Sequence, residues 1–149
     1  METQAVWNVP PVIPTLPADA NFLELAAHCE MLAGRVLEES RSQTHPLLHQ
    51  HLAASLAALH PTLRDPIPPS LMEKLTTDTL PRQPPAMETE SDLLCEYCLV
   101  LNQLLAGSQL TGQQEATLKG LLYELTCFLT DTITAPRWLR TSSGRCAIN

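Results

Sequence analysis

The chain has 149 residues, of which 16 are acidic and 9 are basic, so its formal net charge is −7. Apolar residues make up 44% of it and 27 residues are leucine, which is too much core-forming side chain for a wholly disordered protein. Aromatic residues make up only 4%, and runs of Val and Ile are scarce, which argues against a β-sandwich or a β-barrel. The acidic balance disfavours nucleic acid or an anionic membrane as the main partner, because binding to phosphates depends on clustered Lys and Arg.

No segment predicts export or membrane insertion. Residues 1–20 lack both a positively charged start and an unbroken apolar run, so they do not resemble a secretory signal. No stretch reaches the roughly 18 consecutive apolar residues that a membrane helix needs. The five cysteines are an odd number, and three of them fall on apolar faces of predicted helices, which is typical of reduced thiols rather than of a disulfide framework. We therefore expect a soluble, cytoplasmic protein.

An extended arm opens the chain, and a first helix follows it. Residues 1–20 contain repeated prolines, whose fixed φ angles and missing amide donors keep them extended, close to polyproline II. From about Asn21 to Ser42, apolar residues recur at three- and four-residue spacing and form one stripe. Asp19 or Asn21 can supply the N-cap oxygen of this helix. The stripe consists of Phe22, Leu25, Ala26, Cys29, Leu32, Ala33, Val36 and Leu37.

Two further helices complete an N-terminal helical half, residues 21–80. The second helix begins at Pro46, because the first turn of a helix tolerates a proline, and it ends near His60. Prolines exclude a helix from residues 61–69. Ser70 is then expected to cap a short third helix.

The C-terminal part predicts a linker followed by a helical hairpin. Residues 81–90 are rich in proline and acid, and they form either a linker between two helical halves or a mobile loop. Residues 91–135 hold two amphipathic helices, 91–106 and 111–133, whose short connection makes them an antiparallel hairpin. The expected buried faces are Leu94, Tyr97, Cys98, Leu101, Leu104 and Leu105, and Leu118, Leu121, Leu122, Leu125, Phe128, Leu129 and Ile133. The predicted fold class is therefore all-α, with about five amphipathic helices in a small bundle.

Residues 136–149 form a basic tail, because helical periodicity ends at Pro136 and the three arginines beyond it meet no acid. Arg137, Trp138 and Arg140 offer contacts to a phosphate backbone or to bases. The alternative, which we favour, is that Trp138 folds back on the hairpin while the arginines pair with the protein's own acids. An acidic body repels a nucleic-acid duplex, which supports this second interpretation.

Two groups of side chains have metal-ligand spacing, but neither is complete. Cys95-x-x-Cys98 has the spacing of a zinc or redox motif, yet no second pair stands in register and no strand precedes it. We expect these thiols to pack in the core. His45 and His49 are four residues apart and His51 is close by, but no further ligand is near, so we expect His45 to cap a helix and the other two to lie near the surface. No metal and no cofactor are expected.

No motif for nucleophilic or phosphate chemistry is present, since the chain contains no Gly-x-Ser-x-Gly, Gly-rich phosphate loop or His-Glu-x-x-His. We therefore expect a protein without enzyme activity. The last four residues, Cys146-Ala147-Ile148-Asn149, match the Cys-a-a-X prenylation pattern, but Asn is a poor final residue for it. We interpret this match as a chance occurrence.

Three stretches in the last third of the chain, 104–115, 120–125 and 135–141, carry a resemblance to one class of small proteins. They read LLAGSQLTGQQE, GLLYEL and APRWLRT. In these stretches the chain resembles small helical accessory proteins of enterobacterial prophages and satellite phages. The resemblance implies a non-enzymatic regulator or antagonist that a mobile element encodes, and it carries no functional residue with it.

We expect the protein to bind another macromolecule, most often a protein, through one of two surfaces. The first is an acidic rim, which would occupy a basic surface of a DNA-handling protein and exclude its DNA. The rim consists of Glu88, Glu90, Asp92 and Glu96. The second is any apolar stripe that helix packing leaves uncovered, which would form a homo-oligomer or bind a partner helix.

The leading functional hypothesis is a regulator or inhibitor from a mobile element that blocks or modulates a host or phage DNA-handling protein. One alternative is a self-associating helical scaffold or assembly factor. Another is a weak nucleic-acid-binding regulator that uses the Arg-rich tail.

Overall fold

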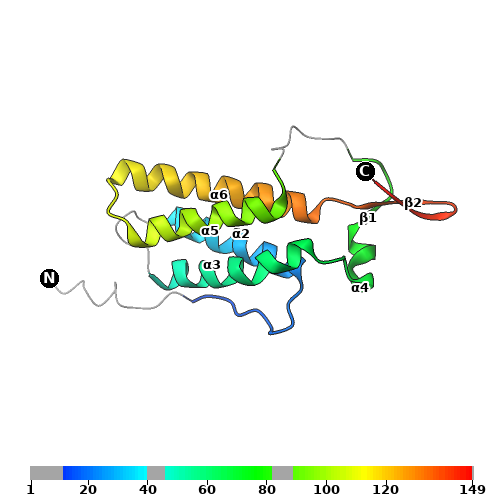
Figure 1. The fold of residues 1–149 in the computed structure, drawn as a ribbon, viewed down its shortest axis with the longest axis horizontal. Coiled ribbons are helices and arrows are strands. Elements are labelled where there is room, and N and C mark those ends of the chain that lie inside the picture. The colour runs from blue at the N-terminus through cyan, green and yellow to red at the C-terminus, as the bar shows by residue number, and fades with distance from the viewer. Residues whose placement is uncertain (1–11, 40–45, 82–88, 149) are drawn as a thin grey trace.

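Four long helices lie side by side and form a bundle (Figure 1). The computed structural model describes residues 12–39, 46–81 and 89–148. The long helices are α2 (Phe22–Glu38), α3 (Pro46–Leu59), α5 (Ser91–Gly107) and α6 (Gly112–Thr134). Helix α2 packs against α3 and α6, and α5 packs against the same two helices. Each long helix therefore has two neighbours around a shared core.

Local side-chain interactions set the ends of these helices. The Asn21 side chain accepts a hydrogen bond from the Glu24 N–H, and the Glu24 carboxylate accepts one from the Asn21 N–H, so a capping box starts α2. Thr111 and Gln114 form the same arrangement at the start of α6. Helix α2 ends at Glu38, before the predicted end at Ser42, which lies outside the described residues.

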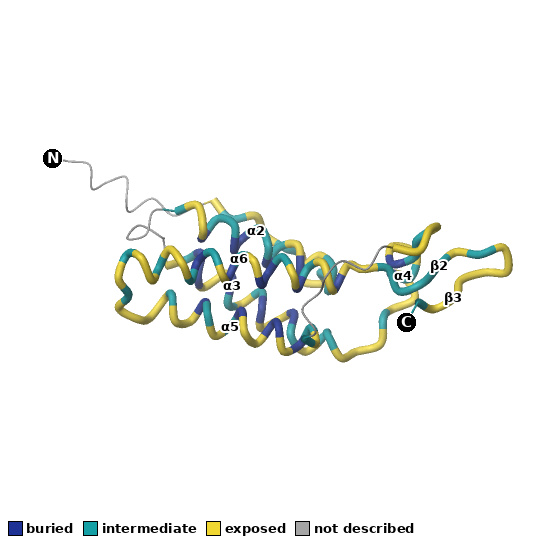
Figure 2. Tube along the Cα trace, turned by 90° about the horizontal axis from the view of Figure 1, so that it is seen from above, coloured by how far each residue is buried: buried dark blue, intermediate teal, exposed yellow. Residues whose placement is uncertain are grey.

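Leucines and small residues fill the space between the four helices. Their positions are dark blue along the tubes of the long helices in Figure 2. The core draws on helices from both sides of the linker at residues 81–90, so the two predicted halves share one interior. Its buried members are Ala26, Cys29, Leu32, Ala33, Val36, Leu48, Leu52, Leu56, Leu59, Leu94, Cys95, Cys98, Leu122, Leu125, Leu129 and Ile133.

The segment after α3 consists of short elements rather than one loop and one helix. A 3-10 helix, η1 (His60–Arg64), continues directly from α3, although we predicted no helix after His60. Its Pro61 falls in the first turn, where the missing N–H has no helical partner to lose. Then come α4 (Pro69–Met72), η2 (Glu73–Leu75) and the strand β1 (Thr76–Thr77). Pro68 rather than Ser70 precedes α4 as its N-cap, so the predicted cap is wrong.

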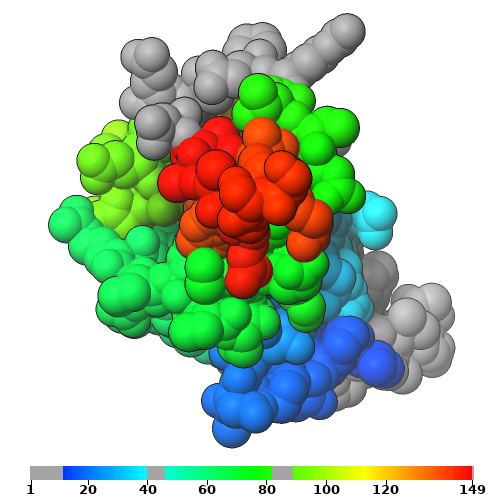
Figure 3. Space-filling model, turned by 90° about the vertical axis from the view of Figure 1, so that its right-hand side faces the viewer, coloured from blue at the N-terminus to red at the C-terminus, as the bar shows by residue number. Residues whose placement is uncertain are grey.

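The chain is mostly helical, but the prediction of a purely all-α fold is wrong. Beyond Pro136 the tail forms two strands, β2 (Trp138–Thr141) and β3 (Gly144–Ala147), that pair antiparallel. Gly144 has a φ of 120°, which a glycine adopts without strain in this tight turn. Strand β2 also pairs parallel with β1, so three strands form a small sheet at one end of the bundle (Figure 1). Seen from that end, the orange and red C-terminal residues lie beside green ones (Figure 3).

The backbone of Trp138 therefore pairs with Thr76 of β1, from the N-terminal half. The pairing continues on either side of the strands, because the Arg137 N–H donates to Leu75 O at 2.7 Å and the Ile148 N–H donates to Arg137 O at 2.8 Å. These bonds satisfy backbone groups that a free tail would leave to water.

Candidate functional site

Six large apolar side chains on α5 and α6 are exposed to solvent instead of packed in the bundle. Their exposed fractions run from 39% to 53%. They are Leu93, Tyr97, Val100, Leu104, Leu121 and Phe128, and we call them the α5–α6 face. Four of these residues, Tyr97, Leu104, Leu121 and Phe128, were predicted to be buried, so that part of the prediction is wrong. Leucines and cysteines one position away on the same helices fill the core in their place.

The exposed residues on each helix form a row. Leu93, Tyr97, Val100 and Leu104 follow one another at spacings of four, three and four residues, which brings them to one side of α5. Leu121 and Phe128 are two turns apart on one side of α6.

Both rows border the seam between α5 and α6. On α5, Asn102 contacts His49 of α3, and Tyr97 and Leu104 lie on the opposite side of the helix from Asn102. On α6, Thr130 reaches α2 by donating to Ala26 O, from the flank opposite Leu121 and Phe128. Each exposed row therefore lies on the side of its helix away from α3 or α2, on the outer face that α5 and α6 share.

The two rows also match in height along the seam. Cys98 Sγ lies 3.6 Å from Thr126 Oγ1, which fixes the level at which the helices touch. The two helices run in opposite directions (Figure 1). Counting away from the contact in both directions therefore places Tyr97 beside Phe128, and Leu104 beside Leu121. The six side chains therefore lie on one face of the α5–α6 pair, with the exposed Glu124 between Leu121 and Phe128 along α6.

Carboxylates border this surface on both helices. Glu96 on α5 is one turn from Val100, and it is exposed. Glu124 lies between Leu121 and Phe128 along α6, and Asp131 follows one turn later; both are exposed. Lys119, the one basic residue in α5 and α6, is 2% exposed, pairs with Glu115 at 3.3 Å and donates to Glu39 O. The border along α6 is therefore acidic, whereas along α5 Glu96 pairs with His60 and the exposed Arg64 lies nearby on Asp92.

The predicted acidic rim does not form one free surface. Asp92 is buried, and the Arg64 guanidinium donates to its carboxylate at 2.6 Å. This hydrogen bond holds the pKa of Asp92 below its ordinary value. Glu96 pairs with His60 at 3.0 Å, and Glu90 is exposed at the start of α5. Glu88 lies outside the described residues.

The predicted basic tail is engaged by the protein's own acids. Arg140 donates to Glu73 at 2.6 Å and to Asp78 at 2.8 Å, and Arg145 donates to Glu73 at 3.4 Å. Arg137 donates to Ala135 O, and burial lowers its pKa. The arginines tie β2 and β3 to the connector beside them, which is the arrangement we favoured over nucleic-acid contacts.

Three thiols, Cys29, Cys95 and Cys98, are fully buried, and we call them the core thiols. The predicted core position of Cys95 and Cys98 is confirmed. Burial is the main cause that raises the pKa of Cys95 to about 12 and that of Cys98 to about 11, and it also raises the pKa of Cys29. Because the thiolate is the form that attacks electrophiles and binds metals, these protonated thiols act as packing groups.

The histidine prediction is wrong for His49, which is buried rather than at the surface. Its Nδ1 lies 2.7 Å from Asn102 Oδ1, and the Asn102 amide donates to His49 O at 2.9 Å. This polar pair fixes the height of α5 against α3. His51 is exposed as predicted, and His45 lies outside the described residues. Among the described residues, no three or more His, Cys, Asp or Glu side chains are placed to share a metal ion.

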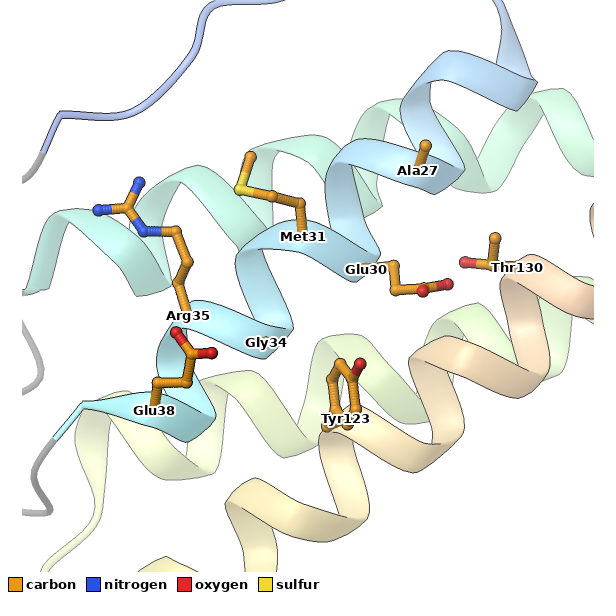
Figure 4. Close-up of a pocket in the computed structure, with 8 residues that line it drawn as sticks. All are labelled: Ala27, Glu30, Met31, Gly34, Arg35, Glu38, Tyr123 and Thr130. Carbon is orange, nitrogen blue, oxygen red and sulfur yellow. The ribbon is translucent and has the colours of Figure 1, made fainter.

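A groove of about 430 Å³ lies between α2 and α6 (Figure 4). Gly34 and Tyr123 both line it, and a Cβ built on Gly34 would lie 3.3 Å from Tyr123 Cε1, so the glycine lets the ring pack close to α2. Glu30 and Glu38 border it from α2. A hydrogen bond with Cys127 is the main cause that raises the pKa of Tyr123. A phenol whose pKa is raised is a poorer nucleophile and base at neutral pH, so the groove shows no activated side chain.

No helix among the described residues has the length and apolar composition needed to cross a membrane. Comparisons of the chain with protein-family models, with curated proteins and with solved structures give no match. The resemblance to phage accessory proteins therefore stays a prediction.

Proposed function

We propose that this protein is a non-enzymatic binding module that takes up another protein on the α5–α6 face. The observation that carries the proposal is the set of six exposed large apolar side chains on one face of two neighbouring helices. Covering side chains that are about half exposed contributes on the order of 1 kcal/mol each. Groups of exposed apolar side chains of this kind mark interaction sites more often than isolated surface leucines do.

The binding surface in this proposal differs from the acidic rim that the sequence suggested. Asp92 drops out because Arg64 already neutralises it, whereas Glu96 stays as part of the border of the apolar face. Within the proposal, a regulator or inhibitor would act by covering a surface that its target needs. The hypothesis that this target is a DNA-handling protein of a host or phage stays a prediction.

A second candidate function is self-association as a scaffold. The four-three-four spacing along α5 favours it, because that spacing is also the one by which helices pair in coiled coils. Sedimentation velocity of the purified chain separates the two candidates. A defined oligomer that dissociates when Val100 and Leu121 are changed to Ser would support the scaffold.

Affinity capture with matched variants tests the proposed function. The tagged full chain is compared with a Val100→Ser, Leu121→Ser double variant and with Leu37→Ser, which changes a comparably exposed leucine (38%) on α2. We expect a protein that the wild type and the Leu37 variant retain and the double variant loses, and we expect the purified partner to reproduce that order in a titration. Identical retention by all three chains would refute the proposal.

A further inference from the structure

We propose that the partner of the α5–α6 face is an amphipathic helix whose apolar stripe is flanked by Lys and Arg. This inference rests on the proposed function and specifies the chemistry of the partner. The shape of the face and the sign of the charges around it carry the argument.

The shape of the face fits a helix. Two parallel rows of side chains, with the half-buried Leu101 and Leu105 and the buried Leu125 between them, make an apolar track along the seam. The row on α5 runs from Leu93 to Leu104, which is about 17 Å at the rise of an α-helix. A partner helix of three to four turns would cover that length with anchors at three- and four-residue spacing.

The charge around the track selects the partner. Glu96 borders it on α5, and Glu124 and Asp131 border it on α6, while the single lysine of these helices is turned toward α2. A second copy seated on this face would bring Glu124 and Asp131 against carboxylates, because α5 and α6 have no exposed Lys or Arg and the nearby Arg64 is already paired with Asp92. A helix flanked by Lys and Arg would instead meet an acid along both edges of its apolar stripe.

The acids also make the proposed binding depend on salt. Exposed charges a few ångströms apart attract strongly in dilute buffer and are screened when the ionic strength rises. The apolar contacts hardly change over the same range. Docking on this face therefore has a salt-sensitive part that selects the partner and a salt-insensitive part that retains it.

Two designed peptides of about 16 residues test the inference. Both carry leucines at the same three- and four-residue spacing, and their flanking positions are all Lys and Arg in the basic peptide and all Glu in the acidic one. Fluorescence anisotropy measures the binding of each labelled peptide to the full chain. We expect the basic peptide to bind at least about tenfold more tightly, and high salt to remove most of that difference.

Variants assign the binding to the face. The Val100→Ser, Leu121→Ser chain should lose about tenfold or more in affinity for the basic peptide, while the Leu37→Ser chain should bind like the wild type. A Glu124→Gln, Asp131→Asn chain should bind the basic peptide more weakly and with a smaller salt dependence.

Three outcomes would overturn the inference in different ways. Equal binding of both peptides, lost in the Val100 and Leu121 variant, would leave the face as a docking site without charge selection. Binding of the basic peptide that no face variant changes would place it elsewhere on the molecule. Binding of neither peptide would reject a basic helix as the partner, and the capture experiment above would then decide whether the face docks any other protein.

Discussion

The His49–Asn102 pair gives the sharpest prediction about how the bundle is held together. Both side chains are buried, with exposed fractions of 7% and 1%, and two hydrogen bonds of 2.7 and 2.9 Å join them across α3 and α5. Asn102→Ala removes both bonds and leaves the buried imidazole nitrogen without its partner. An unsatisfied buried polar group costs about 1–3 kcal/mol, and the small void adds to that, so we expect a loss of about 2–4 kcal/mol in the free energy of unfolding.

A double-mutant cycle isolates the bond between the His49 imidazole and Asn102 Oδ1, because His49→Ala keeps the backbone oxygen to which the Asn102 amide donates. Urea unfolding of Asn102→Ala, His49→Ala and the double variant should give a coupling energy of about 1–3 kcal/mol, because the second substitution removes the group that the first left unpaired. Gln103→Ala, at the neighbouring exposed position, is the matched control and should change the free energy of unfolding by no more than about 0.5 kcal/mol. Purely additive losses, or an Asn102→Ala loss no larger than the control's, would refute the buried pair.

Three further predictions concern the groove, the core thiols and the sheet. Gly34→Ala should raise the free energy of unfolding by roughly 0.5 kcal/mol, which thermal unfolding measures, because alanine favours a helix more than glycine does. The Tyr123 ring borders an open groove and can shift into it to make room for the new methyl group. A lower stability would show that the ring is fixed. The core thiols keep their protons in the folded state, so the free energy of unfolding should begin to fall near about pH 8, where unfolded thiols start to ionise. The slope should approach about 1.4 kcal/mol per thiol per pH unit above about pH 9.5, and a flat profile in urea unfolding would contradict the buried thiols. Arg140→Ala should return the pKa of Glu73 upward toward its ordinary value, which NMR titration measures, and an unchanged titration would show that the ion pair does not form in solution.

Helix positions followed from the sequence where local interactions decide them. The boxes at Asn21 and Thr111 use side chains three residues apart, so a short window of sequence contains both partners. The small sheet was missed for the opposite reason. Strand β1 has two residues, and its partner β2 lies some 60 positions later, so no local pattern connects them.

The α5–α6 face was missed because α5 is apolar around most of its circumference. Its residues support two neighbouring stripes, and periodicity alone cannot tell which of them packs inward. In the structure, α3 contacts Cys95 and α6 contacts Cys98, so the stripe with these two cysteines is buried. Tyr97 and Leu104, on the other stripe, are exposed. The sequence did contain one signal, which is that α5 has more apolar side chains than a single buried stripe can hold. Such a helix has a second apolar surface that another partner must cover.

The most direct test of the proposed docking is a methyl NMR titration of the labelled full chain with the basic peptide. We predict that the largest chemical-shift changes fall on the methyl groups of Leu93, Val100, Leu104 and Leu121, while the shifts of the Leu37 methyl groups on α2 do not change. Shift changes that centre on α2 and α3, or that spread evenly over the bundle, would contradict the claim that the α5–α6 face binds a basic amphipathic helix.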